Sequence, residues 1–326
     1  MKTAFVTGGT GFLGLNLVEQ LTARGWRVVA LHRPTSGVDR LEAFGPELVE
    51  GDITDPESLK AAIPRGVDAV FHMAANTSIW SKHKDRQERE NVRGTINMLA
   101  AARTAGAKRF VHTSTWNTYG LEHREIAETT PQNGGTHWIN YNRTKFLAEE
   151  AVRLAAADGL DAVILNPSHI IGRYDTNNWA RMIVMVAKHR LPGIPPGSGS
   201  FCHGEAVALA HIAAAEQGRT GENYLLGGAD ASFLEVIREI GDLTGEKVPD
   251  KPVSAWALRL AARIIVTISA VTGRQPNVTP EGVAMVLEHP RIVSDKAERE
   301  LGYKPASLRA MLEDAHGWLT AEGLLN

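Results

Sequence analysis

Short apolar runs alternate with longer helical patterns along the first half of the chain. Runs rich in β-branched and aromatic residues predict strands at residues 3–7, 27–32, 48–51, 69–72, 109–113 and 161–165. Between them, apolar residues at helical spacing predict helices at residues 12–24, 56–62, 87–105 and 142–157. Strands joined by single crossover helices form a parallel sheet with helices on both faces. The pattern therefore predicts an α/β fold built on a doubly wound parallel sheet.

The pattern changes after residue 166. Residues 191–200 read Leu-Pro-Gly-Ile-Pro-Pro-Gly-Ser-Gly-Ser, which predicts loops and a domain change. Helices are predicted at residues 205–216, 232–244 and 307–322, and a strand at residues 223–226 that returns to the sheet. We therefore expect a Rossmann-type domain of residues 1–166, completed by residues 201–228. Residues 167–200 and 229–326 are expected to form a smaller, mostly helical portion.

Residues 255–271 form the most apolar stretch of the chain outside the strands. Arg259 and Arg263 interrupt it four residues apart, so both lie on one helical face, and the stretch is too short to span a bilayer. We predict an amphipathic helix that packs against the protein. The alternative is a helix that lies on a membrane surface.

Charge and cysteine content narrow the class of protein. The 35 Lys and Arg nearly balance the 37 Asp and Glu, so neither nucleic acid nor an anionic membrane is expected as the main partner. The single cysteine, Cys202, excludes an internal disulfide, and we expect a small buried residue in a reducing compartment. The N-terminus carries no signal-peptide pattern, and we expect a cytoplasmic protein without a membrane span.

A glycine-rich turn follows the first predicted strand. It reads Thr7-Gly-Gly-Thr-Gly-Phe-Leu-Gly, so Gly8, Gly11 and Gly14 are spaced three apart where a helix begins. Small residues let the backbone approach a pyrophosphate, and the N–H groups and dipole of the following helix stabilise its charge. The context favours a dinucleotide-binding loop over an ordinary glycine-rich turn.

Two residues four apart carry the candidate chemistry. Tyr141 and Lys145 share one helical face, and a nearby ammonium lowers the pKa of a phenol that is otherwise about 10. Upstream, residues 112–120 place several hydroxyls at the carboxyl end of the fifth strand, the edge where doubly wound sheets bind ligands. Thr115 is the candidate to hold a substrate carbonyl oxygen, with Ser114 as its rival. The alternative is that these hydroxyls only cap the local turn.

These segments together resemble the extended short-chain dehydrogenases/reductases of the NAD-dependent epimerase/dehydratase superfamily. The glycine loop matches their T-G-x-x-G-x-x-G pattern, residues 141–145 match Y-x-x-x-K, and residues 112–120 match the hydroxyl-rich segment that ends in Tyr-Gly. Residues 71–75, 90–95, 223–228 and 301–305 match further family segments, and the resemblance covers almost the whole chain. It departs at residues 201–207, where two acids of the family pattern are altered.

The resemblance implies a nicotinamide-dependent oxidoreductase in which the Rossmann-type domain binds the dinucleotide and the C-terminal portion binds the substrate. The catalytic residues it implies are Thr115, Tyr141 and Lys145. The implied cofactor-binding residues are Gly8, Thr10, Gly11, Phe12, Leu13, Arg33, Asp52, Ile53, Ala74, Ala75, Tyr141, Lys145, Asn166, Pro167 and His169. Asn91 is expected either to cap its helix or to hold a catalytic water.

Cofactor choice is expected to depend on the end of the second strand. NAD enzymes place a carboxylate there, whereas a cation fits the 2′-phosphate of NADP. This sequence offers Arg33 and Ser36 and no acid before Asp39, so we expect NADP, with NAD possible and a merely solvated Arg33 as the alternative. No metal is expected, since His137 and His169 lack ligand spacing and read as local hydrogen bonders.

Two reactions fit the resemblance. Residues 191–201 contain no arginine to clamp a sugar diphosphate, and residues 166–172 resemble the Asn-Pro form of the dihydroflavonol reductases. We therefore expect a reductase of an apolar ketone or aldehyde, with a nucleotide-sugar epimerase or dehydratase as the alternative. Arg173 and Arg181 remain candidates to bind an anion. Trp179, Met182, Met185 and the helix at residues 256–268 could line a hydrophobic pocket, and for most of them the favoured alternative is the core of the smaller portion. A catalytically silent NADP-binding regulator is disfavoured, because Thr115, Tyr141 and Lys145 are all present.

The resemblance also implies a homodimer that forms through residues 87–105 and 142–157.

Overall fold

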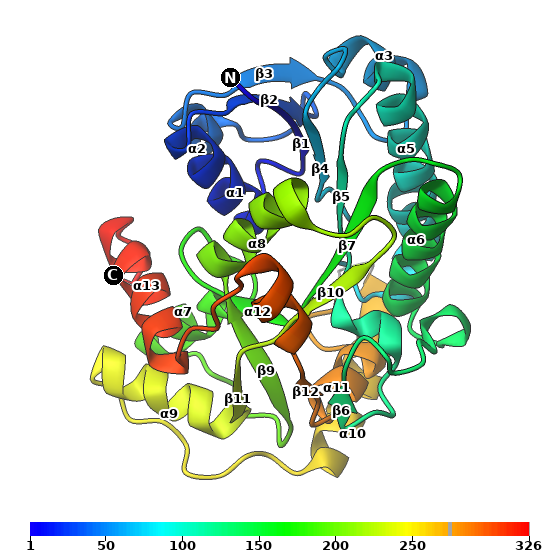
Figure 1. Ribbon diagram of the computed structural model, residues 1–326. Coiled ribbons are helices and arrows are strands. Elements are labelled where there is room, and N and C mark those ends of the chain that lie inside the picture. Colours follow the sequence, from blue (N-terminus) through cyan, green and yellow to red (C-terminus); the bar gives the residue numbers. More distant parts are fainter. Residues whose placement is uncertain (273–275, 326) are drawn as a thin grey trace.

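The computed structural model describes residues 1–272 and 276–325, and a seven-stranded parallel sheet forms its centre (Figure 1). The strand order is β10-β7-β5-β4-β1-β2-β3, so the chain runs outward from β1 in both directions. The strands are β1 (Thr3–Thr7), β2 (Arg27–His32), β3 (Glu47–Glu50), β4 (Ala69–His72), β5 (Phe110–Thr113), β7 (Ala162–Pro167) and β10 (Asn223–Leu226). The predicted doubly wound Rossmann-type sheet is confirmed, including the late strand that returns to it.

Helices cover both faces of this sheet, which explains why its central strands are apolar on both sides. On one face lie α1 (Phe12–Ala23) and α8 (Gly204–Gln217), which contact each other closely. The other face is covered by α3 (Pro56–Ala62), α5 (Gly94–Ala105) and α6 (Asn140–Ala157). Along β7 successive side chains alternate between the two layers, so Val163 and Leu165 belong to the first and Ile164 to the second.

The predicted helix at residues 87–105 consists of several pieces. These are the last residue of α4 (Lys84–Gln87), the π-helical η2 (Glu88–Arg93) and α5, and the short η1 (Ser81–His83) precedes them. In the π-helical turn the buried Asn91 accepts a bond from the Asn76 N–H at 2.7 Å and donates to the Asn76 carbonyl at 3.0 Å. Asn91 therefore fastens the β4–α4 loop, and it is not the cap of a helix. π-Helical turns of this kind occur mostly as local insertions at functional sites.

The C-terminal portion contains a small sheet that the sequence did not predict. Its strands are β8 (His169–Ile171), β9 (Ser198–His203) and β11 (Ala229–Ser232), in the order β11-β9-β8. The prediction of loops throughout residues 191–200 was therefore wrong for residues 198–200. Their Gly/Ser composition carries no strand signal, and antiparallel pairing with β11 holds them extended.

Helices pack around this small sheet and enclose a third apolar cluster. The cluster includes Ile171, Phe201, Phe233 and residues of α7 (Ala180–Ala187), α9 (Phe233–Thr244) and α13 (Leu308–Ala321). The remaining elements are α2 (Asp39–Glu42), η3 (Trp116–Tyr119), β6 (Glu125–Ile126), η4 (Gly134–Thr136), α10 (Ala255–Thr272), α11 (Pro280–Val286), β12 (Arg291–Ile292) and α12 (Asp295–Leu301).

Helix α10 departs from the amphipathic helix that was predicted. Its inward residues pack as expected, with Ala262 fully buried. Its outward residues are apolar as well, and Trp256 and Ile264 are 72% and 51% exposed. These outward side chains lie neither in the core nor in a substrate pocket. Across residues 1–272 and 276–325 no helix has the length and hydropathy needed to cross a membrane.

Close backbone packing fixes the turn between β1 and α1. Gly8 adopts φ +75°, and a Cβ on it would lie 2.7 Å from the Ala74 nitrogen. At the first turn of α1, a Cβ on Gly14 would overlap the Gly8 carbonyl oxygen. Both glycines are therefore required by contact within the protein itself.

We predict that Gly14→Ala lowers the free energy of unfolding by about 1–3 kcal/mol, because the methyl group forces the turn apart. Gly317→Ala is the matched control: that glycine lies in the exposed part of α13 with open space around it. The control is expected to raise the free energy of unfolding by up to about 1 kcal/mol through helix propensity. Urea denaturation of both variants measures the difference, and equal effects would contradict the packing argument.

Candidate active site

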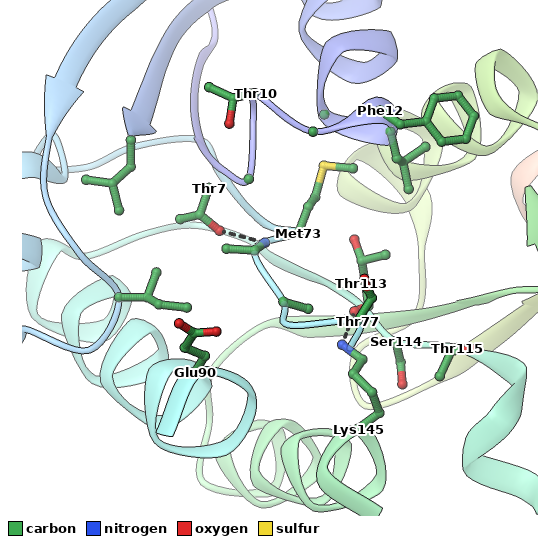
Figure 2. Close-up of a pocket in the computed structure, with 18 of the residues that line it drawn as sticks. Thr7, Thr10, Phe12, Met73, Thr77, Glu90, Thr113, Ser114, Thr115 and Lys145 are labelled. Atoms are coloured by element: carbon green, nitrogen blue, oxygen red, sulfur yellow. Dashed lines mark hydrogen bonds between the residues drawn. The ribbon is translucent and has the colours of Figure 1, made fainter. Parts of the chain in front are cut away.

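A cavity of about 460 Å³ opens at the carboxyl edge of the parallel sheet. It extends from the β1–α1 turn past the ends of β2, β4, β5 and β7 to the start of α6 (Figure 2). Most of the residues predicted for the site lie in its wall: Gly8, Thr10, Gly11, Phe12, Leu13, Arg33, Asp52, Ile53, Ala74, Ala75, Thr115, Tyr141, Lys145 and Pro167.

The N-terminus of α1 forms one wall of this cavity. Its N-cap residue is Gly11, and no side chain caps the helix there. The first N–H groups of α1 therefore keep their hydrogen-bonding capacity at the pocket, where Gly11, Phe12 and Leu13 line it. Unpaired N–H groups at the positive end of a helix dipole fit a pyrophosphate, so this part of the chain suits a dinucleotide.

Charged side chains of both signs lie at the β2 end of the cavity. Arg33 and Ser36 line it, and the Arg33 guanidinium is 3.8 Å from a Glu90 carboxylate oxygen. Glu90 is held by a 2.8 Å bond from Arg86 and a 2.7 Å bond from Asn76. The long contact leaves the Arg33 side chain half exposed, so it can turn toward a phosphate. The contact with Glu90 was not foreseen.

Tyr141 and Thr115 meet in the wall of the cavity. Burial raises the pKa of Tyr141 to about 12, and a hydrogen bond with Thr115 opposes this rise. The expected lowering of the Tyr141 pKa by Lys145 is therefore wrong for this structure, because burial outweighs the neighbouring groups. The phenol is protonated at neutral pH and can act as an acid.

The Thr115 hydroxyl caps the local turn, one of the two roles that the sequence offered for it. It caps η3 by accepting a bond from the Asn117 N–H at 3.3 Å, and it accepts a second from the Asn117 amide at 3.2 Å. Two accepted bonds occupy its lone pairs, so its own hydrogen is the donor in the hydrogen bond with Tyr141. Thr115 is thus a turn cap whose O–H is directed at the Tyr141 phenol oxygen.

Lys145 projects from α6 toward the end of β5, as Figure 2 shows. Its ammonium donates to the Thr113 carbonyl oxygen at 2.7 Å. Burial lowers the pKa of Lys145 to about 8, and the Glu149 carboxylate one turn further along α6 opposes this. Because about 8 lies above neutral pH, Lys145 carries a positive charge beside Tyr141 at pH 7.

The fully buried Glu149 carboxylate connects several side chains at the base of the site. It accepts hydrogen bonds from Ser114 at 2.6 Å and from Asn166 at 2.9 Å. Gln132 donates to it at 2.7 Å and Arg153 pairs with it at 2.6 Å. The hydroxyl hydrogen of Ser114, the rival of Thr115 in the sequence analysis, is therefore engaged in the bond to Glu149. The sequence analysis missed Glu149.

Two predicted cofactor residues lie outside the cavity wall. Asn166 donates to the Thr115 carbonyl at 3.1 Å from below the site. His169 packs among the aromatic rings of Trp116, Trp179 and Phe201, and in the described part of the chain it makes no hydrogen bond, contrary to expectation. Burial lowers the pKa of His169 to about 4. The cavity is instead completed by residues not predicted for the site: Thr7, Met73, Thr77, Glu90, Thr113, Ser168, Ile170 and Asn178.

Arg173 is not free to bind an anion. Its guanidinium forms ion pairs with Asp314 at 3.0 Å, Glu205 at 3.1 Å and Glu19 at 3.5 Å. Glu205 belongs to residues 201–207, where the sequence departs from the family pattern, and its carboxylate pairs with Arg173.

His137 accepts a local bond from the Ile139 N–H at 3.0 Å, as expected. Cys202 is buried as expected, and burial raises its pKa to about 12.

Comparison with known proteins places these features in a family. The profile of the NAD dependent epimerase/dehydratase family matches residues 4–227. A Synechocystis sp. protein with the provisional name dihydroflavonol 4-reductase is 32% identical over 98% of this chain and 95% of its own. A Stigmatella aurantiaca protein, 4-hydroxy-2-methyl-3-oxo-4-farnesyl-3,4-dihydroquinoline-1-oxide ketoreductase, is 33% identical over 93% and 92% of the two chains.

A solved structure has the same architecture. The UDP-glucose-4-epimerase of Stenotrophomonas maltophila, with bound NAD and formylated UDP-arabinopyranose, superposes with a TM-score of 0.80 at 25% identity and covers 99% of both chains. The relatives are thus reductases and dehydrogenases, whereas the structural neighbours include epimerases. This chain belongs to the NAD-dependent epimerase/dehydratase family and is an enzyme of the extended short-chain dehydrogenase/reductase type.

Proposed function

We propose that this enzyme is an NADP(H)-dependent reductase of a mainly apolar ketone or aldehyde. The observation that carries the proposal is the lack of a free cation on the substrate side. Residues 191–201 contain no Lys or Arg, and Lys145, the only cation in the described cavity wall apart from Arg33 at the β2 end, is bound to the Thr113 carbonyl. A sugar diphosphate brought into a partly dry cleft without cations to pair it costs several kcal/mol.

The surroundings of the two arginines that were candidates to bind an anion also favour the reductase. Arg173 is engaged by three carboxylates, and Arg181 is an exposed residue of α7 outside the cavity wall. The names of the relatives support the same class, since they include a dihydroflavonol reductase, a quinoline-oxide ketoreductase and a 3 beta-hydroxysteroid dehydrogenase. The epimerase neighbour supports the alternative, a nucleotide-sugar epimerase with tightly held cofactor.

In this proposal each residue of the wall has one task. Reduced nicotinamide, when bound, supplies the hydride. Tyr141 gives a proton to the carbonyl oxygen, and the Thr115 O–H, which otherwise bonds Tyr141, holds that oxygen in place. The positive charge of Lys145 stabilises the phenolate left on Tyr141. Hydride and one proton together convert the carbonyl to an alcohol.

We propose NADP because Arg33 and Ser36 line the β2 end of the cavity. A guanidinium bonds a phosphate through two parallel N–H groups. Asp52, in the same part of the wall, accepts bonds from the Thr54 N–H and hydroxyl at 2.8 Å, which engage its Oδ1. The epimerase neighbour holds NAD, so cofactor preference is the part of the proposal most in need of a direct test.

We also propose the domain division and the assembly. Residues 1–166 and 201–228 form the dinucleotide-binding unit, because β10 and α8 complete its sheet and its helical layer. Residues 167–200 and 229–326 form the substrate-binding portion. A homodimer through α5 and α6 is supported by exposed apolar residues on both helices, Ile96 at 48% and Leu154 at 71%.

Replacing Tyr141 tests the proton donor. Tyr141→Phe is expected to lower kcat at least about 100-fold while NADPH affinity stays within about twofold, because only the transferable proton is lost. Lys145→Met is expected to reduce both. Steady-state kinetics and fluorescence titration measure these effects, and activity within about tenfold of wild type in Tyr141→Phe would rule out the assignment.

Replacing Arg33 tests cofactor choice. Arg33→Gln is expected to weaken NADPH at least about tenfold and to leave NADH nearly unchanged, because only NADPH carries the 2′-phosphate. Arg24→Gln, an exposed cation outside the cavity, is the control. Equal losses of affinity for the two cofactors, or a preference of the wild type for NADH, would show that Arg33 does not select the cofactor.

The substrate class is tested by offering both kinds of ligand to the cofactor-loaded enzyme. NADPH consumption is expected with apolar ketones such as steroid or flavonoid carbonyls, and UDP- or dTDP-sugars are expected to show no micromolar binding in calorimetry. Protein purified without added cofactor is expected to carry no retained nicotinamide. Micromolar binding of a sugar nucleotide, with oxidised cofactor retained, would favour the epimerase.

Light scattering tests the dimer. The wild type at micromolar concentration is expected to give twice the chain mass of 35.3 kDa. Leu154→Glu is expected to shift the mass toward the monomer, because a charge in a helical interface is costly to bury. Asp39→Asn, on the distant α2, is the control. A wild-type mass near 35.3 kDa would refute the dimer.

A further inference from the structure

The outward face of α10 is apolar along its length. Trp256, Leu260, Ile264 and Ile268 are 72%, 42%, 51% and 56% exposed, and they recur every four residues. Residues four apart on a helix lie above one another, so these side chains form one continuous stripe, here called the α10 stripe. Figure 1 places α10 beside α11 at the edge of the molecule.

The inward face of the same helix is also apolar. Ala262 is fully buried, and Leu258, Ile265 and Val266 are partly buried against the protein. Apolar side chains thus occupy both the covered face of α10 and the face that the described protein leaves open. Elsewhere in the described chain the large exposed apolar residues Ile96, Trp138 and Leu154 lie on different elements. The α10 stripe is therefore a contiguous apolar surface of the kind that marks an interaction site.

The charge of this segment differs from that of the whole chain. Residues 251–280 contain Lys251, Arg259, Arg263 and Arg274 and no Asp or Glu, although the chain as a whole has a formal charge of −2. Arg259 and Arg263 are exposed on one flank of the stripe, and neither forms an ion pair within the described residues. Outside the segment, Glu288 lies within electrostatic range of Arg259: burial raises the pKa of Glu288, and His289 and Arg259 oppose this rise.

The positive charge beside the apolar stripe favours a lipid surface over a second copy of the chain as the partner of α10. In a two-fold contact through α10, the same patch would meet itself, so the contact would carry Arg259 and Arg263 of both copies, four cations, at its edges. No acidic residue of the segment is available to pair with them. Anionic headgroups supply that missing negative charge, and the acyl boundary accepts the apolar stripe.

We propose that α10 is a docking surface for an anionic lipid bilayer. The helix lies in the plane of the interface, with the α10 stripe at the boundary between headgroups and acyl chains. Arg259 and Arg263 extend along the apolar surface to the lipid phosphates. The inference is independent of the substrate. On the protein side, Gly282 of α11 lies against Ile79, in the loop that supplies Thr77 to the cavity wall, so the docked face is close to the active site.

Co-sedimentation of the full-length protein with vesicles tests the charge requirement. Binding is expected to vesicles of phosphatidylcholine with about one third phosphatidylserine, and to fall sharply without phosphatidylserine or in high salt. Arg259→Gln with Arg263→Gln is expected to weaken binding about 30-fold, or about fivefold for each cation. Arg24→Gln with Arg65→Gln removes two exposed cations elsewhere and is expected to leave binding unchanged.

Fluorescence quenching by brominated lipid tests which face is buried. Quenching by vesicles is expected in wild type and in Trp138→Phe, and it is expected to be lost in Trp256→Phe. Trp256→Ser with Ile264→Ser is expected to abolish vesicle binding without changing NADPH affinity, because both side chains are exposed.

Three results would overturn the inference. They are equal binding with and without phosphatidylserine, quenching that survives Trp256→Phe, and a concentration-dependent mass that the α10 variants abolish. The last result would assign the face to a second copy. The quenching experiment keeps the wild-type fold, so it decides the matter even if a serine variant fails to fold.

Discussion

The active site depends on one buried carboxylate. Glu149 is fully enclosed between α6, β5 and β7, and an unpaired charge in that position would cost several kcal/mol. Four donors satisfy it, and two of them, Ser114 and Asn166, come from the ends of neighbouring strands. Because the carboxylate must be fully bonded, the strand ends are fixed relative to α6, and with them Thr115 is fixed relative to Tyr141. The same charge opposes the loss of the proton from Lys145.

Much of this arrangement could be predicted from the sequence, because the relevant signals are local. The glycine spacing after β1, the apolar strands and the Tyr141–Lys145 spacing each follow from short-range geometry. Parallel strands then bring their carboxyl ends together, which places residues far apart in sequence in one cavity. This is why Arg33, Asp52, Ala74 and Thr115 line the same wall although their predictions were made separately.

Other features could not be predicted because they depend on long-range contacts. Glu149 looks like an ordinary helical acid four residues before a cation, and only the fold reveals that it is buried. Residues 198–200 belong to a Gly/Ser segment that predicts a loop, and pairing with the distant strand β11 makes them part of β9. For α10, the sequence revealed its hydrophobicity but not which half of its surface the rest of the protein covers. The direction of the Tyr141 pKa shift likewise depends on burial.

The ion pairs of Arg173 limit how the molecule can move. Glu19, Glu205 and Asp314 come from α1, α8 and α13, so one guanidinium joins the nucleotide-binding half to the last helix of the chain. His203 adds a 3.0 Å contact to the same Asp314. A hinge-like rotation that opened the two portions would break three contacts: Arg173 with Glu19, Arg173 with Glu205, and His203 with Asp314. Local loop motion at the cavity mouth would leave all three intact, so these contacts favour it over a rotation of one portion against the other.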